Sequence, residues 1–277
     1  MRKKVYILPN SEKCYALEDC DIICSSLCEN GFCCNVSAIP ENADNGQHLS
    51  DADFLVVLGG DGTIIQVARA TVGMNIPIIG MNYGNVGYMA AVGKGDVDSL
   101  IGILNGGYMI QERMMLDVDI IKEDKTVRAL ACALNEAVIS NGPIPHLVEF
   151  ELYCDGHICQ HVRSDGMIIA TPTGSSAYSM SAGGPIMDPQ LSCICATPIC
   201  PHHRNSRPVI FGGDSVIEIR NAKCRSNGIY LSVDGKEVFE VGDGDVIRIS
   251  KSKYTVPIVT KGDNSFMEVL DAKLSSH

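Results

Sequence analysis

The chain has 277 residues, of which 45% are hydrophobic and 20% are charged, and its formal net charge is −11 at pH 7. This composition is typical of a folded globular protein, and the length allows one large core or two smaller ones. A charge this negative argues against a general nucleic-acid or anionic-membrane surface. It leaves a nucleotide substrate possible, because local amides and a few basic residues can hold phosphates.

The N-terminal segment predicts a strand and not a signal peptide. Its apolar stretch after Lys4 is short and runs into a turn, and no apolar run in the chain reaches the length of a membrane-spanning helix. Thirteen cysteines occur without a C-x-x-C pair, so we expect reduced thiols in a cytoplasmic protein. From the net charge and the lack of a long apolar run we expect neither membrane nor nucleic-acid partners. Cys20, Cys24 and Cys28 recur every four residues and are expected to form a buried stripe of one helix rather than a metal site.

The first part of the chain alternates between predicted strands and helices. We expect strands at 3–8, 33–39, 54–58 and 76–81, helices at 11–29, after residue 62 and at 95–105, and a polar loop at 40–50. This alternation is typical of a parallel sheet whose ligands lie beyond the carboxyl ends of the strands. The turn after residue 58 and the loop 82–88 both fall at such ends.

The stretch FLVVLGGDGTIIQVARA joins a buried strand to a helix through a glycine turn. We expect Thr63 to be the helix N-cap, with Gln66 completing a capping box. Free backbone amides at such a helix start can bind an anion, and the surrounding glycines let a ligand approach closely. Asp61 in this turn therefore suggests a catalytic group beside a bound phosphate.

This turn fits neither the G-x-G-x-x-G fingerprint nor the G-x-x-x-x-G-K-[ST] loop. The alternative explanation is a tight strand-to-helix turn with a surface aspartate. Its charge would stabilise the helix through the helix dipole, and it would have no catalytic role.

From about residue 108 the pattern changes to short alternating strands and tight turns. Asp155-Gly156 and Asp234-Gly235 are hairpin signals. We therefore divide the chain into an α/β domain at 1–112 and an all-β domain at 113–258. The tail 259–277 is predicted to contain a helix and to pack back on the first domain.

Two stretches of the second part are more polar than a β core requires. Asn135-Glu136 interrupts an apolar strand, which indicates either a site or an edge where both side chains face water. Residues 163–185 hold many small residues, hydroxyls and one tyrosine in a long loop. Hydroxyls and amides can bond a base edge and Tyr178 can stack on a ring, so a binding loop is favoured over a plain connection.

Taken in order, GGDGT, Asn135-Glu136, the run DGMIIATPTGSSAYSMSAGGP and the segment ICPHHRNSRP resemble the NAD kinase family. The matches extend over residues 56–208, and lipid kinases share only the first motif. The resemblance implies a Rossmann-like α/β domain followed by an all-β sandwich, with NAD lying between them. It implies Mg²⁺-dependent phosphoryl transfer from ATP to the 2′-hydroxyl of the adenosine ribose, which gives NADP, in a homodimer or homotetramer.

The resemblance also implies roles for individual residues. Asp61 would be the base that takes the ribose proton, and the turn at the phosphate donor would contain Gly59, Gly60, Gly62 and Thr63. The NAD-binding residues would be Gly62, Asn135, Glu136, His146, Arg163, Asp165, Thr173, Ser176, Ala177, Tyr178, Ser179, Met180 and Ser181.

The chain departs from the family pattern at two positions. Ser176 stands where threonine is frequent, which keeps the hydroxyl, and Lys236 stands where glutamine is frequent, which puts any contact there in doubt.

Two other functions fit part of the pattern. A lipid kinase would share the glycine turn, but the acidic chain has no basic or amphipathic membrane-binding stretch. A non-catalytic dinucleotide-binding regulator would be expected to lack Asp61. The metal ligands and the range of phosphoryl donors, ATP alone or also polyphosphate, stay open.

Overall fold

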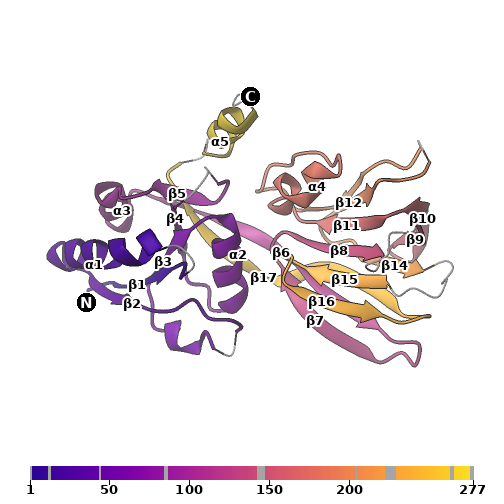
Figure 1. The fold of residues 1–277 in the computed structure, drawn as a ribbon, viewed down its shortest axis with the longest axis horizontal. Coiled ribbons are helices and arrows are strands. Elements are labelled where there is room, and N and C mark those ends of the chain that lie inside the picture. The colour runs from indigo at the N-terminus through magenta and orange to yellow at the C-terminus, as the bar shows by residue number, and fades with distance from the viewer. Residues whose placement is uncertain are drawn as a thin grey trace. The chain divides into compact units, whose positions relative to one another are not determined.

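The computed structural model describes residues 2–11, 14–43, 45–83, 87–141, 147–203, 205–221, 229–262 and 265–274. The chain forms two compact units, one of Met1–Arg113 with Tyr254–His277 and one of Met114–Lys253 (Figure 1). The chain passes from one unit to the other within strand β6 (Met109–Ile121) and again within strand β17 (Val246–Thr260). No helix in the described ranges combines the length and apolar character needed to cross a membrane.

Unit 1 is a parallel sheet with helices packed against it. The strand order is β5-β4-β3-β1-β2, and the end of β17 pairs in parallel with β4. Its elements are β1 (Lys4–Pro9), α1 (Cys14–Glu29), β2 (Cys33–Val36), the 3₁₀ turn η1 (Gln47–Leu49), β3 (Phe54–Gly59), α2 (Asp61–Ala70), β4 (Ile78–Asn82), β5 (Ala90–Gly93), α3 (Val97–Leu104) and α5 (Ser265–Leu274).

Strand β3 is central in its sheet because β1 and β4 pair with its two edges. All six of its residues are buried, as a strand between β1 and β4 requires. Alternate residues Val56 and Leu58 pack in one apolar cluster with Ile23 and Leu27 of α1 and with residues of α3. The carboxyl end of this rigid strand is where the glycine turn begins.

The predicted elements of unit 1 are found, but several bounds differ. Strand β5 and the turn η1 were not predicted, and β2 ends at Val36 rather than at residue 39. The prediction that three cysteines of α1 form a buried stripe is wrong at its C-terminal end: Cys20 is buried, Cys24 is half-buried and Cys28 is exposed. A spacing of four residues drifts about 40° per step around a helix, so the stripe leaves the buried face.

Unit 2 is a β-sandwich built from antiparallel strands. In one sheet the order is β10-β9-β14-β17, with β6 beside β17 and β7 beside β6. The other sheet has the order β13-β12-β11-β8-β15-β16. Buried residues of both sheets, such as Leu116, Phe150, Ile169 and Leu231, form one core between them.

Besides parts of β6 and β17, unit 2 contains further strands, a 3₁₀ turn and a short helix. They are β7 (Val127–Ala133), β8 (Glu136–Asn141), β9 (Val148–Cys154), β10 (His157–Ser164), β11 (Gly166–Ala170), η2 (Gly174–Ser176), α4 (Tyr178–Ser181), β12 (Cys193–Ile199), β13 (Val209–Gly212), β14 (Ile217–Asn221), β15 (Ile229–Val233) and β16 (Glu237–Val241).

The predicted fold class, an α/β region followed by an all-β sandwich, is confirmed. Both predicted hairpins are present: Asp155-Gly156 joins β9 to β10, and Asp234-Gly235 joins β15 to β16. All four turn residues have positive φ angles, between 48° and 78°. Aspartate followed by glycine tolerates this conformation, which matches the twist of the flanking strands.

Candidate functional site

The glycine turn of unit 1 lies between β3 and α2. Gly60 has the extended conformation of an N-cap residue, and Asp61 is the first residue of the helix. The predicted Thr63–Gln66 capping box is wrong, because the amides of Thr63 and Ile64 already bond to the carbonyl of Gly60. With glycine at the N-cap, no side chain caps this helix start.

Thr63 instead fixes the turn to the sheet. It is buried, and its Oγ1 accepts a hydrogen bond of 2.9 Å from Nδ2 of Asn10, the residue after β1. A Cβ on Gly59 would lie 2.5 Å from the same Oγ1, whereas Cβ atoms on Gly60 and Gly62 would meet nothing within 4 Å. Gly59 is therefore required by packing, and Gly60 and Gly62 leave open space beside the backbone.

The carboxylate of Asp61 is held by the segment that follows the loop after β4. It accepts hydrogen bonds from the amides of Tyr88 (2.9 Å) and Met89 (3.3 Å). A Cβ on Gly87 would overlap Oδ1 of Asp61, so the backbone comes as close to the carboxylate as a glycine permits. The sequence placed the loop 82–88, which includes Gly87 and Tyr88, at the same kind of strand end as Asp61, but it indicated neither Met89 nor these contacts with the carboxylate.

The surroundings of Asp61 are partly apolar. The ring of Tyr88 lies 6.1 Å from that of Phe266 in α5, measured between ring centroids. Burial raises the pKa of the Tyr88 hydroxyl, and the charge of Asp61 adds to this effect. Tyr88 is therefore a neutral neighbour of the carboxylate at physiological pH.

The Asn135–Glu136 pair lies in unit 2, where β7 gives way to β8. Both residues are buried, so the alternative in which they face water is wrong. Asn135 Oδ1, Glu136 Oε2 and Thr173 Oγ1 are buried atoms with no hydrogen-bond partner among the described residues. Burial, and then the charge of Asp234, raises the pKa of Glu136 to about 8.

Backbone contacts bring Thr173 to this pair. The amide of Thr171 donates to the carbonyl of Asn135 (2.8 Å), and the Thr171 hydroxyl donates to the carbonyl of Leu134 (2.6 Å). A Cβ on Gly174 would overlap the carbonyl of Asn135. An unsatisfied buried polar atom costs about 1–3 kcal/mol, so three such atoms on neighbouring segments make this place a candidate binding site.

The loop after β11 contains a short 3₁₀ turn, η2, and the short helix α4. Ser176 Oγ donates to the carbonyl of Thr173 (3.3 Å), and Ala177 separates the two helical turns. Ser179 is buried with its hydroxyl 2.9 Å from that of Thr197, so it also packs the loop. The exposed residues of α4 are Tyr178, Met180 and Ser181.

The remaining predicted residues lie elsewhere in unit 2. Arg163 on β10 is half-exposed, 3.9 Å from Glu149, and lines a small pocket of about 220 Å³ with His161 and His203. Asp165 precedes β11, and its amide bonds to the carbonyl of Ile199 (3.0 Å). His146 lies outside the described residues. The ligand contacts of these residues stay predictions.

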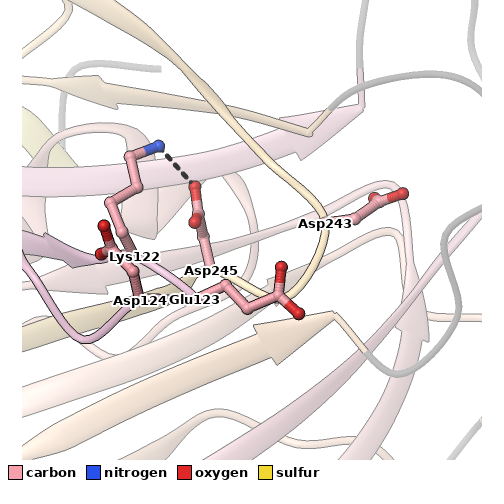
Figure 2. Close-up of a pocket in the computed structure, with 5 residues that line it drawn as sticks. All are labelled: Lys122, Glu123, Asp124, Asp243 and Asp245. Carbon is pink, nitrogen blue, oxygen red and sulfur yellow. Dashed lines mark hydrogen bonds and ion pairs between the residues drawn. The ribbon is translucent and has the colours of Figure 1, made fainter.

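A larger pocket of unit 2, about 510 Å³, is formed by the turns β6–β7 and β16–β17 (Figure 2). It is lined by Lys122, Glu123, Asp124, Asp243 and Asp245, and Lys122 is paired with Asp245 at 2.6 Å. Four carboxylates around one paired ammonium group repel phosphate, so this pocket is unsuited to a nucleotide.

No resident metal site is found in the part of the chain that the structure describes. There, no three or more His, Cys, Asp or Glu side chains gather as ligands for an ion. Mg²⁺ in phosphoryl-transfer sites is commonly held by one or two carboxylates and the substrate phosphates. Asp61 is a carboxylate of this kind, so the residues present fit such an ion.

Comparison with known proteins shows the family of the chain. The family models described as ATP-NAD kinase N-terminal and C-terminal domains match residues 27–108 and 134–261. An NAD kinase of Acetivibrio thermocellus is 36% identical, over 98% of this chain and 96% of its own length. An NAD kinase of Symbiobacterium thermophilum is 38% identical, over 84% of this chain and 82% of its own length.

Two solved structures share the fold. Yeast NADH kinase complexed with NADH has a TM-score of 0.87 and 24% identity, over 100% of this chain and 88% of that chain. An NAD kinase from Archaeoglobus fulgidus in complex with ATP has a TM-score of 0.79 and 23% identity, over 99% and 100% of the two chains. At these identities the likeness shows the fold, while the family models and the closer relatives show the family. The chain therefore belongs to the NAD kinase family.

Proposed function

We propose that the chain transfers the γ-phosphoryl group of ATP to the 2′-hydroxyl of the adenosine ribose of NAD, which yields NADP and ADP. The observation that supports this most directly is the position of Asp61. Its carboxylate is the first side chain of α2, at a helix start without a side-chain cap, and two backbone amides hold it in place. A carboxylate within hydrogen-bond reach of a hydroxyl is a suitable general base.

In the proposed reaction Asp61 accepts the proton of the 2′-hydroxyl. The ribose oxygen then forms a bond to the γ-phosphorus, and the bond from that phosphorus to the β–γ bridging oxygen breaks, so that ADP leaves. Phosphoryl transfer depends mainly on positioning and charge neutralisation. The positive end of α2 and the open backbone at Gly60 and Gly62 suit the phosphates.

Mg²⁺ bound to the donor phosphates would neutralise their charge, with Asp61 as the protein carboxylate able to contact it. The residues of this chain do the rest: they orient the acceptor, exclude water and receive the proton.

The polar pair of unit 2 serves the acceptor in this proposal. The unpartnered atoms of Asn135, Glu136 and Thr173 gain hydrogen bonds from the adenosine portion of NAD, and the exposed ring of Tyr178 offers a stacking surface. The roles of Gly62, Arg163, Asp165 and the loop 176–181 stay predictions. The cytoplasmic location and the homodimer or homotetramer also stay predictions. Sedimentation analysis would test the oligomeric state.

The test is Asp61→Asn, assayed for NADP formation from NAD, Mg²⁺ and a panel of donors that includes ATP and polyphosphate. We expect turnover to fall about 10²- to 10⁴-fold, because the amide keeps the shape but cannot take the proton. Asp96→Asn is the matched control. Asp96 is the N-cap of α3 in the same unit and accepts the amide of Ser99, and asparagine caps a helix equally well.

Near-parent turnover of Asp61→Asn would show that Asp61 is not the base. If the parent protein binds NAD but makes no NADP from any donor, the regulator hypothesis replaces the kinase. Phosphorylation of diacylglycerol or sphingosine in place of NAD would support the lipid kinase.

A further inference from the structure

One carboxylate organises the backbone of the Asn135–Glu136 pair. Oδ2 of Asp234 accepts the amide of Leu134 (2.9 Å), and Oδ1 accepts the amides of Asn135 (2.9 Å) and Glu136 (3.0 Å). The amide of Asp234 in turn donates to the carbonyl of Glu136 (3.0 Å). Four hydrogen bonds thus join one turn residue to three consecutive residues that lie about 100 positions earlier in the chain.

The hairpin turn alone does not require aspartate at this position. Asp234 has φ 48° and is followed by Gly235 with φ 67°. Asparagine and glycine adopt this conformation at least as readily. Only an ionised carboxylate offers acceptor sites on both oxygens for three amides. The identity of residue 234 is therefore explained by the segment 134–136 and not by the turn.

The three hydrogen bonds to the Asp234 carboxylate fix the backbone of residues 134–136, and this backbone sets the direction of their side chains. Asn135 Oδ1 and Glu136 Oε2 are held in buried positions without partners among the described residues, which an unrestrained segment would relieve by turning them to water. Strand pairing supports the same geometry, because Val233 pairs with Ala137 and Ala170 pairs with Glu136. A binding group is effective when a second set of contacts locks its orientation.

We propose that Asp234 is a positioning residue for the acceptor nucleotide, acting through Asn135 and Glu136. It does not contact NAD itself. It holds the backbone on which two polar side chains present their unpartnered oxygens to the adenosine portion. This inference rests on the proposed function, since it takes NAD as the ligand of that pair.

The chain contains a matched control for this residue. Asp155 opens the β9–β10 hairpin with φ 51°, followed by Gly156, and it also exchanges backbone hydrogen bonds with a distant residue, although its carboxylate accepts one backbone amide instead of three. Its Oδ1 accepts the amide of Val216 (2.8 Å), and its own amide donates to the carbonyl of Val216 (2.9 Å). It differs from Asp234 in what it holds, because Val216 is an apolar residue outside the proposed site.

The experiment compares Asp234→Asn and Asp234→Gly with Asp155→Asn and Asp155→Gly. Asparagine keeps one oxygen acceptor and glycine keeps none, while both suit the positive φ angle, so all four variants retain the turn. We expect the KM for NAD to rise about 10-fold in Asp234→Asn and further in Asp234→Gly. The KM for ATP should change less than about 2-fold, and the Asp155 variants should keep parent values for both substrates.

Two further readouts separate positioning from general loss of stability. Amide hydrogen exchange of the segment 131–141 should become faster in the Asp234 variants and not in the Asp155 variants. The pH dependence of the KM for NAD should move to lower pH in Asp234→Asn, because burial still raises the pKa of Glu136 but the added effect of the Asp234 charge is removed. A merely structural role would leave this pH profile unchanged.

The proposal would be overturned if both Asp234 variants had the same KM for NAD and the same amide exchange rate as the parent protein. Asn135→Ala distinguishes its failure from failure of the proposed function. If exchange quickens in the Asp234 variants but neither they nor Asn135→Ala alter the KM for NAD, then the pair does not bind NAD. In that case the assigned ligand is wrong, and the acceptor-positioning role falls with it.

Discussion

At the scale of single residues, the glycines around Asp61 differ in what their missing side chains permit. Gly60 and Gly62 border open space, whereas a methyl group on Gly87 would overlap the Asp61 carboxylate. The amides of Tyr88 and Met89, which follow Gly87, bond that carboxylate. Gly87 is therefore part of the support of the proposed base.

We predict that Gly87→Ala lowers the rate of NADP formation about 10- to 100-fold, because displacement of a reacting group by about 1 Å has effects of this size. The thermal midpoint should fall less than for a core substitution, since the clash is local. Gly93→Ala is the control, as a methyl group there meets nothing within 4 Å. Equal rates for the two variants would show that Gly87 does not position Asp61.

A second residue-scale effect is the protonation of Glu136. Its pKa in the folded protein is about 8, against an ordinary value of 4.5, and burial is the main cause. Between pH 4.5 and about pH 8, the folded protein therefore keeps a proton on Glu136 that the unfolded chain has released. The stabilising contribution is fully present below about pH 4.5 and is lost as the pH rises toward 8.

We predict that Glu136→Gln removes this pH dependence. The parent should lose up to about 1.4 kcal/mol of unfolding free energy per pH unit across the window, from this one group. The gap in thermal midpoint between variant and parent should then widen from pH 5.5 to pH 8.5 in favour of the variant. A gap that is constant with pH would contradict a protonated Glu136. Glu240→Gln, at an exposed position of β16, is the comparison.

At the scale of elements, the starts of helices α2 and α3 in unit 1 differ in how they are capped. α3 begins with Asp96, whose side chain accepts the amide of Ser99, while α2 begins after Gly60 without a side-chain cap. The end of α3 is equally regular: the amides of Gly106 and Gly107 bond to the carbonyls of Ile103 and Gly102, as in a Schellman motif. α3 is therefore capped by a side chain at its start and by backbone hydrogen bonds at its end, whereas no side chain caps the start of α2.

The regularity of α3 predicts a stabilising substitution. Gly102 is exposed in the helix interior, and a methyl group there meets nothing within 4 Å. Gly102→Ala should raise the free energy of unfolding by about 0.4–1 kcal/mol, because alanine loses less backbone entropy on folding. Gly106→Ala should have the opposite sign, since φ at Gly106 is 114°. Chemical denaturation of both variants checks the pair, and the same sign for both would refute the argument.

At the scale of the whole molecule, the described residues form two large apolar cores. One lies among β1, β3, β4, α1 and α3, and the other lies between the two sheets of unit 2. The eleven cysteines with described side chains are all free thiols, spread over both units. Burial raises the pKa of Cys20 to about 11 and also raises that of Cys195, so these thiols are both shielded and protonated.

This distribution predicts two classes of thiol reactivity. The exposed residues Cys159 and Cys200 should react quickly with a water-soluble thiol reagent, and the buried residues Cys20 and Cys195 should react only as the protein unfolds. Peptide mass spectrometry over a labelling time course measures the rates for each residue. Labelling of Cys195 as fast as that of Cys200 in the native protein would contradict the packing described for unit 2.

Local patterns in the sequence were sufficient to predict the fold class and to single out the glycine turn that carries Asp61. Apolar runs, alternation and Asp-Gly pairs act over a few residues, so they indicate strands, helices and hairpins without any knowledge of distant contacts. The motifs from GGDGT to ICPHHRNSRP indicated the family for the same reason, since each is continuous in the chain.

Only the tertiary structure decided what surrounds the proposed site residues. Asp61 is packed against Gly87 and bonded by the amides of Tyr88 and Met89, which lie 26–28 residues later in the chain. Asp234 is bonded by the amides of residues 134–136, which lie 98–100 residues earlier. Asp155-Gly156 and Asp234-Gly235 are the same signal in sequence, and only the neighbouring strand distinguishes their roles. Burial of Glu136, and with it the raised pKa, likewise depends on packing between distant strands, which no local pattern contains.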